Sequence, residues 1–180
     1  MDIHGNIKEI ISLLKTAYGR PPALRKSDPI DELVRTILSQ NTTDKNSLKA
    51  FTALKSAFRS WEGLRRAPAA RIERLICHAG LANIKAGRIK EALAEIKRRE
   101  GRISLSRLKG LSVQGAIEYL RSLKGVGPKT AACVLLFSFG KPVMPVDTHI
   151  FRVTKRLGLV PKDLSIEEAH RLLSVIVPIV

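Results

Sequence analysis

Apolar side chains recur three and four residues apart in segment after segment of this chain, and no stretch alternates apolar and polar residues as a half-buried strand does. The clearest segment begins at Asp28-Pro29, an N-cap residue followed by a proline that the first helical turn tolerates. Its apolar residues then fall on one helical face: Ile30, Leu33, Val34, Ile37 and Leu38. The pattern predicts an all-α protein.

The same signals predict helices over residues 43–58, 68–78, 83–100, 112–122 and 166–177. In the first of these, Leu48, Phe51 and Leu54 form the expected apolar stripe. Gly80 and Gly101 are expected to stop the second and third helices in a left-handed conformation. A further helix that begins at Pro128 is apolar around its whole circumference, which predicts a central, buried helix.

The charge of the chain favours a polyanionic partner. Its 180 residues include 32 Lys and Arg but 16 Asp and Glu, a net charge of +16. The basic residues are spread along the sequence, so the positive field belongs to the folded surface and not to a tail. A merely solubilising surface is the alternative. The length allows one good core, or two small lobes that share a cleft.

The cysteines and the apolar runs indicate a reducing compartment and no membrane. Cys77 and Cys133 lie in apolar helical runs and are expected to be core residues, with no disulfide framework or metal-ligand spacing. The longest apolar run, within residues 131–139, is far shorter than the about 20 residues of a membrane-spanning helix. We expect a cytoplasmic protein, associated with the nucleoid in a prokaryote, or a nuclear protein in a eukaryote.

A glycine-rich turn precedes the buried helix. Gly125 and Gly127 flank Val126, which permits a tight turn whose N–H groups face a phosphate while Val126 points inward as an anchor. The positive end of the following helix faces the same phosphate. Lys124 and Lys129 flank this turn. An ordinary helix-to-helix turn is the alternative, but such a turn needs a single glycine.

The run from Leu123 to Ala132, together with Pro145 to Val153, resembles the helix-hairpin-helix and Gly/Pro…Asp signature of endonuclease III and its relatives. Residues 38–44 resemble the family's loop that enters DNA opposite the lesion, and residues 80–86 resemble its second wedge loop. The resemblance covers about residues 28–160. It implies two helical lobes with a cleft between them: a six-helix lobe of residues 28–140, and a second lobe of residues 1–27 and 141–180.

The resemblance also implies the function and the site. The expected partner is double-stranded DNA that contains a damaged base or an abasic site, bound by a monomer. Lys129 is the expected nucleophile at the sugar C1′, forming a Schiff base that leads to β-elimination, and Asp147 is its carboxylate partner. The residues expected to contact DNA are Gln40, Asn41, Leu81, Lys124, Gly125, Val126, Gly127 and Thr130. Alternatively, Lys129 only contacts a phosphate; Asp147 is also expected to cap a helix, and the two roles can coexist.

The chain departs from the family in one respect. Relatives often continue into a loop whose four cysteines hold a [4Fe–4S] cluster, whereas this chain has no cysteine after Cys133. We therefore expect no cofactor within this chain. Its apolar end favours a fragment, with an incomplete second lobe, over a lineage that has lost the cluster.

Three functions stay open at this point. The first is a glycosylase with lyase activity, by family default acting on oxidised pyrimidines. The second is a monofunctional glycosylase of the same fold for mismatches or other lesions. The third is a non-catalytic helix-hairpin-helix module that binds DNA. The third explains the charge and the two glycines but leaves the pairing of Lys129 with Asp147 unexplained.

Overall fold

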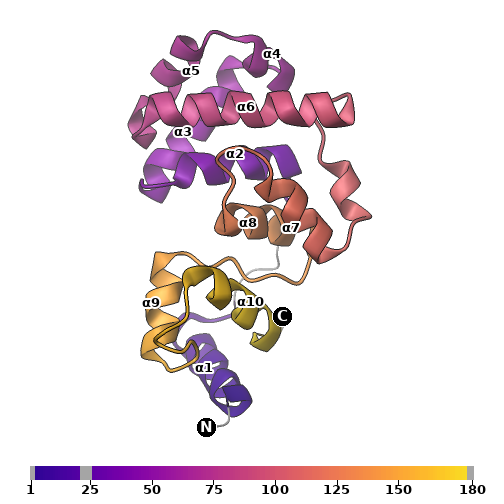
Figure 1. The fold of residues 1–180 in the computed structure, drawn as a ribbon. Helices are drawn as coiled ribbons and strands as arrows, with labels where there is room; N and C mark the ends of the chain where they lie inside the picture. Colours follow the sequence, from indigo (N-terminus) through magenta and orange to yellow (C-terminus); the bar gives the residue numbers. More distant parts are fainter. Residues whose placement is uncertain (1–2, 21–25, 178–180) are drawn as a thin grey trace.

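The computed structural model describes residues 3–20 and 26–177, and within these ranges it contains helices and no strand. The predicted all-α fold is confirmed. Figure 1 shows the helices in chain order: α1 (Ile3–Tyr18), α2 (Pro29–Ser39), α3 (Asp44–Ala57), α4 (Trp61–Arg66), α5 (Ala69–Ile76), the 3-10 turn η1 (Cys77–Ala79), α6 (Ala82–Glu100), the 3-10 turn η2 (Ser106–Lys109), α7 (Val113–Arg121), α8 (Pro128–Phe139), α9 (Thr148–Arg156) and α10 (Ile166–Ile176).

Helix α2 lies at the centre of the larger group of helices. Asp28 caps it, because one carboxylate oxygen accepts hydrogen bonds from the N–H groups of Ile30 (2.9 Å) and Asp31 (3.0 Å). Its apolar face is buried as predicted and packs against α3, α6 and α8. The middle of α8 is buried on all sides, from Thr130 to Leu135. These two helices therefore form the scaffold on which the loops around them are placed.

The structure corrects the apolar stripe of α3. Phe51 and Leu54 are buried, but Leu48 is 59% exposed. The buried face includes Ser47 and Ala50 instead. Ser47 lies on this face because it precedes Ala50 by three residues and Phe51 by four. Leu48 follows Ser47 and is rotated by about 100° from it, which turns the leucine to solvent.

Two other local expectations also need correction. Cys77 is exposed because it begins the turn η1, whereas Cys133 is buried as expected. Gly80 has a positive φ of 68° but an extended ψ of 156°, so it is not left-handed helical; that conformation belongs to Leu81 (φ 49°, ψ 39°). The predicted left-handed stop at Gly101 is confirmed (φ 71°, ψ −14°). Helix α4 was not predicted, since six residues show no helical period.

A second hydrophobic cluster lies around α9 and α10. Its buried residues are Val146, Val160, Ala169 and Leu173, separate from the larger core that runs from α2 to α8. Ser165 and Glu168 form the predicted capping box at the start of α10. Figure 1 shows α1 and α10, which lie at opposite ends of the sequence, side by side. The division into lobes 28–140 and 1–27 with 141–180 stays a prediction, which the two clusters support.

None of the helices in the described part of the chain has both the length and the apolar character that crossing a membrane requires.

Candidate active site

A cleft of about 720 Å³ lies where the start of α8 faces the start of α9. Its walls are formed by Thr36 and residues 39–44, by residues 127–130, by residues 146–149, and by Ile166. Lys129 and Asp147 both line this cleft, although they belong to different helices. The cleft therefore has an amine and a carboxylate, from two different helices, among the residues that line it.

Lys129 is the second residue of α8. Gly127 is the N-cap in an extended conformation (φ −90°, ψ 179°), and Pro128 occupies the first helical position, where its missing N–H has no consequence. Lys129 is partly buried. One turn further along, burial raises the pKa of the Cys133 thiol, and the positive charge of Lys129 opposes that rise. The thiol behind the amine is accordingly kept in its neutral form.

Asp147 is fixed as the N-cap of α9. Its Oδ1 accepts hydrogen bonds from the N–H groups of His149 (2.9 Å) and Ile150 (2.8 Å). The preceding Val146 is fully buried in the second hydrophobic cluster, which holds the backbone at this point. Both capping bonds end on Oδ1, so Oδ2 is the oxygen that the cap does not use. The predicted capping role of Asp147 is confirmed, and it leaves a carboxylate oxygen for a second role.

The glycine turn has the predicted anchor. Val126 is 6% exposed, and its N–H donates to the Leu123 carbonyl at 3.1 Å. Gly125 has a φ of 81°, and a Cβ at this position would lie 2.6 Å from Cδ of Arg88. Lys124 lies outside the cleft, where its ammonium pairs with Glu91 of α6 at 2.9 Å. The turn is thus a tight backbone feature packed against α6.

Of the two expected wedge loops, the first contributes residues to the cleft and Leu81 of the second does not. Gln40 and Asn41 line the cleft, and Asn41 is left-handed with a φ of 51°. The Gln40 side chain accepts a hydrogen bond from Arg88 (2.8 Å) and donates to the Gly125 carbonyl (3.4 Å). Leu81 does not line the cleft and is 49% exposed. The cleft therefore brings together Gln40, Asn41, Gly127, Lys129, Thr130 and Asp147, while Leu81, Lys124, Gly125 and Val126 lie outside it.

Known proteins match most of the chain. Residues 34–178 match the family model described as HhH-GPD superfamily base excision DNA repair protein. The chain belongs to this family. Endonuclease III of Thermotoga maritima is 36% identical over 154 residues, which are 86% of this chain and 68% of that protein. An Arabidopsis thaliana protein provisionally named as a DNA glycosylase is 46% identical over 133 residues, 74% of this chain but 45% of its own length.

Solved structures of the HhH-GPD family share the fold. A non-covalent endonuclease III–DNA complex superposes with a TM-score of 0.82 at 28% identity, covering 99% of this chain and 79% of that one. A trapped covalent endonuclease III–DNA intermediate gives the same TM-score at 27% identity and covers 99% of this chain and 80% of its own. Both neighbours are complexes with DNA. The predicted resemblance to the endonuclease III branch is confirmed.

An iron–sulfur cluster held by four cysteines does not fit this chain. Its two cysteines lie in separate elements, Cys77 exposed in η1 and Cys133 buried in α8. Among the residues that the structure describes, no three or more His, Cys, Asp or Glu side chains are grouped so as to hold a metal ion. No step of the chemistry is therefore assigned to a cluster.

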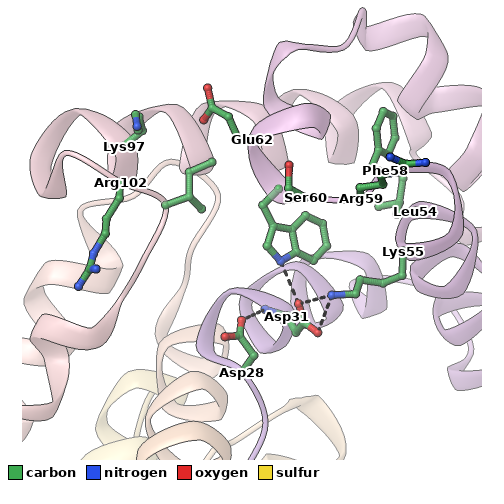
Figure 2. Close-up of a pocket in the computed structure, with 12 residues that line it drawn as sticks. Asp28, Asp31, Leu54, Lys55, Phe58, Arg59, Ser60, Glu62, Lys97 and Arg102 are labelled. Carbon is green, nitrogen blue, oxygen red and sulfur yellow. Dashed lines mark hydrogen bonds and ion pairs between the residues drawn. The ribbon is translucent and has the colours of Figure 1, made fainter.

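A second hollow, of about 690 Å³, lies between α2, α3, α4 and the end of α6. Figure 2 shows Asp31 among the residues that line it, with dashed lines to its partners: the carboxylate accepts hydrogen bonds from Lys55 (3.0 Å) and from the Trp61 indole N–H (2.9 Å). The acid is thus engaged by two neighbouring elements. These bonds connect α2 to α3 and α4, and we assign the hollow no chemistry.

Lys85 and Arg88 of α6 do not line the cleft, and the sequence did not reveal that they contact the segments beside it. Arg88 counted there only as one of the basic residues spread along the chain, and Lys85 also as part of the 80–86 segment, with no role of its own. Lys85, however, is 1% exposed, and the helical period contained the signal. The buried positions Ile89, Ala92 and Ile96 follow Lys85 by four, seven and eleven residues, which places the lysine on the same inward face.

Proposed function

We propose that this protein excises damaged bases from double-stranded DNA as a glycosylase and then cleaves the abasic strand as a lyase. The observation that carries the proposal is the shared cleft of Lys129 and Asp147 directly beside the helix-hairpin-helix turn. A module that only binds DNA has no use for an amine and a carboxylate facing one cavity. The family's name for base excision DNA repair supports the same reading.

The proposed reaction begins at the sugar of a nucleotide turned out of the double helix into the cleft. The neutral Lys129 amine forms a bond to C1′ while the glycosidic bond breaks, and the base leaves with the bonding electron pair and takes up a proton. Positive charge develops on the sugar in this transition state. In this proposal Oδ2 of Asp147, which the helix cap does not use, stabilises that charge and accepts the proton that the nitrogen loses.

The second step follows from the covalent bond. Opening of the sugar ring converts the Lys129 adduct to a Schiff base, which makes the C2′ proton acidic. Loss of that proton breaks the C3′–oxygen bond, and the 3′ phosphate leaves. Water then releases the Lys129 amine. Each step needs only the DNA, water and the two side chains, so the scheme calls for no metal or redox cofactor.

DNA binding is proposed to use the surface around the cleft. The N–H groups of the 125–127 turn and the start of α8 face a phosphate. Gln40, Asn41 and Leu81 fill the space that the extruded nucleotide leaves. Oxidised pyrimidines are the proposed lesions, on the strength of the likeness to endonuclease III alone.

Borohydride trapping tests the proposal. Incubating the protein with a thymine glycol duplex and sodium borohydride is expected to give a covalent protein–DNA adduct, because borohydride reduces the Schiff base. Lys129→Gln removes the amine and is expected to abolish the adduct and to lower strand cleavage by about a thousandfold. Lys109→Gln, an exposed lysine of η2, is the matched control that keeps it.

Two outcomes would contradict parts of this proposal. Base release without an adduct or a nick would support the monofunctional glycosylase instead. Binding without base release, equal in the parent and in Lys129→Gln, would support the non-catalytic module. Asp147→Asn adds a separate test, since it keeps a side-chain oxygen for the cap but lowers base release by about a hundredfold.

A further inference from the structure

Lys85 is a buried cation whose two partners lie at the ends of two different elements. Its ammonium donates to the Leu38 carbonyl at 2.8 Å and to the Ala79 carbonyl at 2.7 Å. Leu38 is in the last turn of α2, and Ala79 ends η1. Carbonyl groups at the C-terminal ends of helices carry partial negative charge and need donors. A single side chain from α6 satisfies both.

The two carbonyls come immediately before the segments that enter DNA in the proposed function. Leu38 precedes the loop of residues 40–43, and Ala79 precedes the turn of residues 80–81. Both segments contain a left-handed residue other than glycine, Asn41 and Leu81. Such conformations are costly for these side chains, above all for leucine, and persist where the surroundings enforce them. The two segments also lie close together: a Cβ added at Gly80 would lie 3.9 Å from the Asn41 carbonyl oxygen.

Burying an ammonium group is unfavourable unless its hydrogen bonds are made. Desolvation lowers the pKa of Lys85, and the charge of Arg88 lowers it further. A methionine or leucine would fill the same space without that penalty. The two bonds to the Leu38 and Ala79 carbonyls are what compensates for the burial of this ammonium.

Arg88, one helical turn after Lys85, continues the connection. It donates to the Gln40 side chain, which in turn donates to the Gly125 carbonyl of the hairpin. Its aliphatic carbons pack against Gly125, where a Cβ would lie 2.6 Å from Cδ. The first two turns of α6 therefore connect loop 40–43, turn 80–81 and the hairpin.

We propose that Lys85, extended by Arg88, is a positioning residue that holds loop 40–43 and turn 80–81 at a fixed separation, so that both enter the DNA together. This inference rests on the proposed function. Lys85 touches no substrate. It acts by keeping Gln40, Asn41 and Leu81 in the arrangement that replaces an extruded nucleotide, and its loss leaves the chemistry of Lys129 and Asp147 intact.

The test compares two substrates under single-turnover conditions. In one duplex thymine glycol faces adenine, and in the other it faces an abasic analogue, which leaves no partner base to separate. Extruding a paired nucleotide requires its base pair to be broken. Lys85→Met is therefore expected to slow base release from the paired lesion by about tenfold and from the unpaired lesion by less than about twofold. Lys85→Arg keeps a cation and is expected to restore part of the rate.

Lys90→Met is the matched control. Lys90 belongs to the same helix and also donates to a backbone carbonyl, that of Ala67, but it reaches neither of the two segments. It is expected to lower the thermal midpoint without discriminating between the two duplexes. Equal slowing of both substrates by Lys85→Met would overturn the proposal, because a purely structural role predicts that result.

Two further results separate the possible failures. If the parent protein releases no base from either duplex, the proposed function fails, whatever Lys85 does. If Lys85→Met does not fold, Arg88→Met decides, because it removes only the outer link to Gln40. Arg88→Met is expected to slow base release less than Lys85→Met does, and from the paired lesion alone. An effect of equal size on both duplexes, zero included, would overturn the proposal.

Discussion

Each lysine near the cleft meets a different set of partners. Lys85 is buried and donates to two carbonyls, and Lys124 is exposed and pairs with Glu91. Lys129 lines the cleft at the start of α8, with the neutral thiol of Cys133 one turn behind it. A covalent role needs an amine that reaches an open cavity. Position, rather than residue type, distinguishes the proposed nucleophile from the other two.

The two glycines of the hairpin differ in what they tolerate. Gly125→Ala places a Cβ at a φ of 81° and 2.6 Å from Arg88, so it is expected to destabilise the protein by about 1–3 kcal/mol. Gly127→Ala meets no atom within 4 Å and keeps an ordinary φ of −90°. It is expected to change stability by less than about 0.5 kcal/mol. Urea unfolding measures the free energy of unfolding of both variants. Equal losses of stability would contradict the view that only Gly125 is held in a tight, positive-φ position.

Helix α6 ends in a compact group of charged side chains. Glu95 accepts hydrogen bonds from Arg98 and from Arg99, and these lower the pKa of Glu95 to about 2. An acid with a lowered pKa in the folded state stabilises the fold at pH values above 4.5, its ordinary value. That contribution is lost as the pH falls from 4.5 to about 2.

Glu95→Gln is therefore expected to lower the thermal midpoint at pH 7 and to match the parent protein near pH 2. The difference should shrink across the interval between 4.5 and about 2, where the parent carboxylate takes up its proton. Thermal unfolding followed by circular dichroism from pH 7 to pH 2 measures it. Since these side chains lie at the surface, the effect is small. A difference that stays constant down to pH 2 would rule out this cause.

The helices that sequence reasoning predicts well are the long ones with caps. Helices α2 and α10 carry both a side-chain cap and an apolar period, and both form as predicted. Helix α4 is too short to show a period. The left-handed Leu81 was not foreseen, because leucine has no local preference for that conformation and the neighbouring segments impose it.

The candidate site was predictable to a different extent. The hairpin follows from its own residues, since Val126 and Gly125 adopt the inward and tight conformations that the spacing requires. The placement of Lys129 and Asp147 beside one cleft does not follow from spacing, because the path of residues 141–146 is set by the packing of two clusters. Only the resemblance to a family supplied it. Lys85 was missed because a lysine is assigned to the surface by default.

At the scale of the whole molecule, the net charge of +16 draws the chain to DNA, but single acids modulate that attraction locally. Sixteen acidic residues are present, and several are held by neighbouring arginines. Glu91 differs, because it pairs with Lys124 of the proposed phosphate-binding turn. A phosphate that approaches this turn competes with the Glu91 carboxylate for the same ammonium.

Glu91→Gln is accordingly expected to tighten binding to undamaged duplex DNA by about threefold at low salt, since Lys124 then pairs with phosphate. The salt dependence of the binding constant is expected to steepen by up to about one released ion. Fluorescence anisotropy at several salt concentrations measures both quantities.

Glu73→Gln of α5 changes the net charge by the same amount and is the control for long-range attraction. If the two variants bind alike, the field of the whole molecule governs affinity and the pair between Lys124 and Glu91 has no separate effect. A gain confined to Glu91→Gln instead places the contact at the hairpin, because removing this carboxylate frees Lys124.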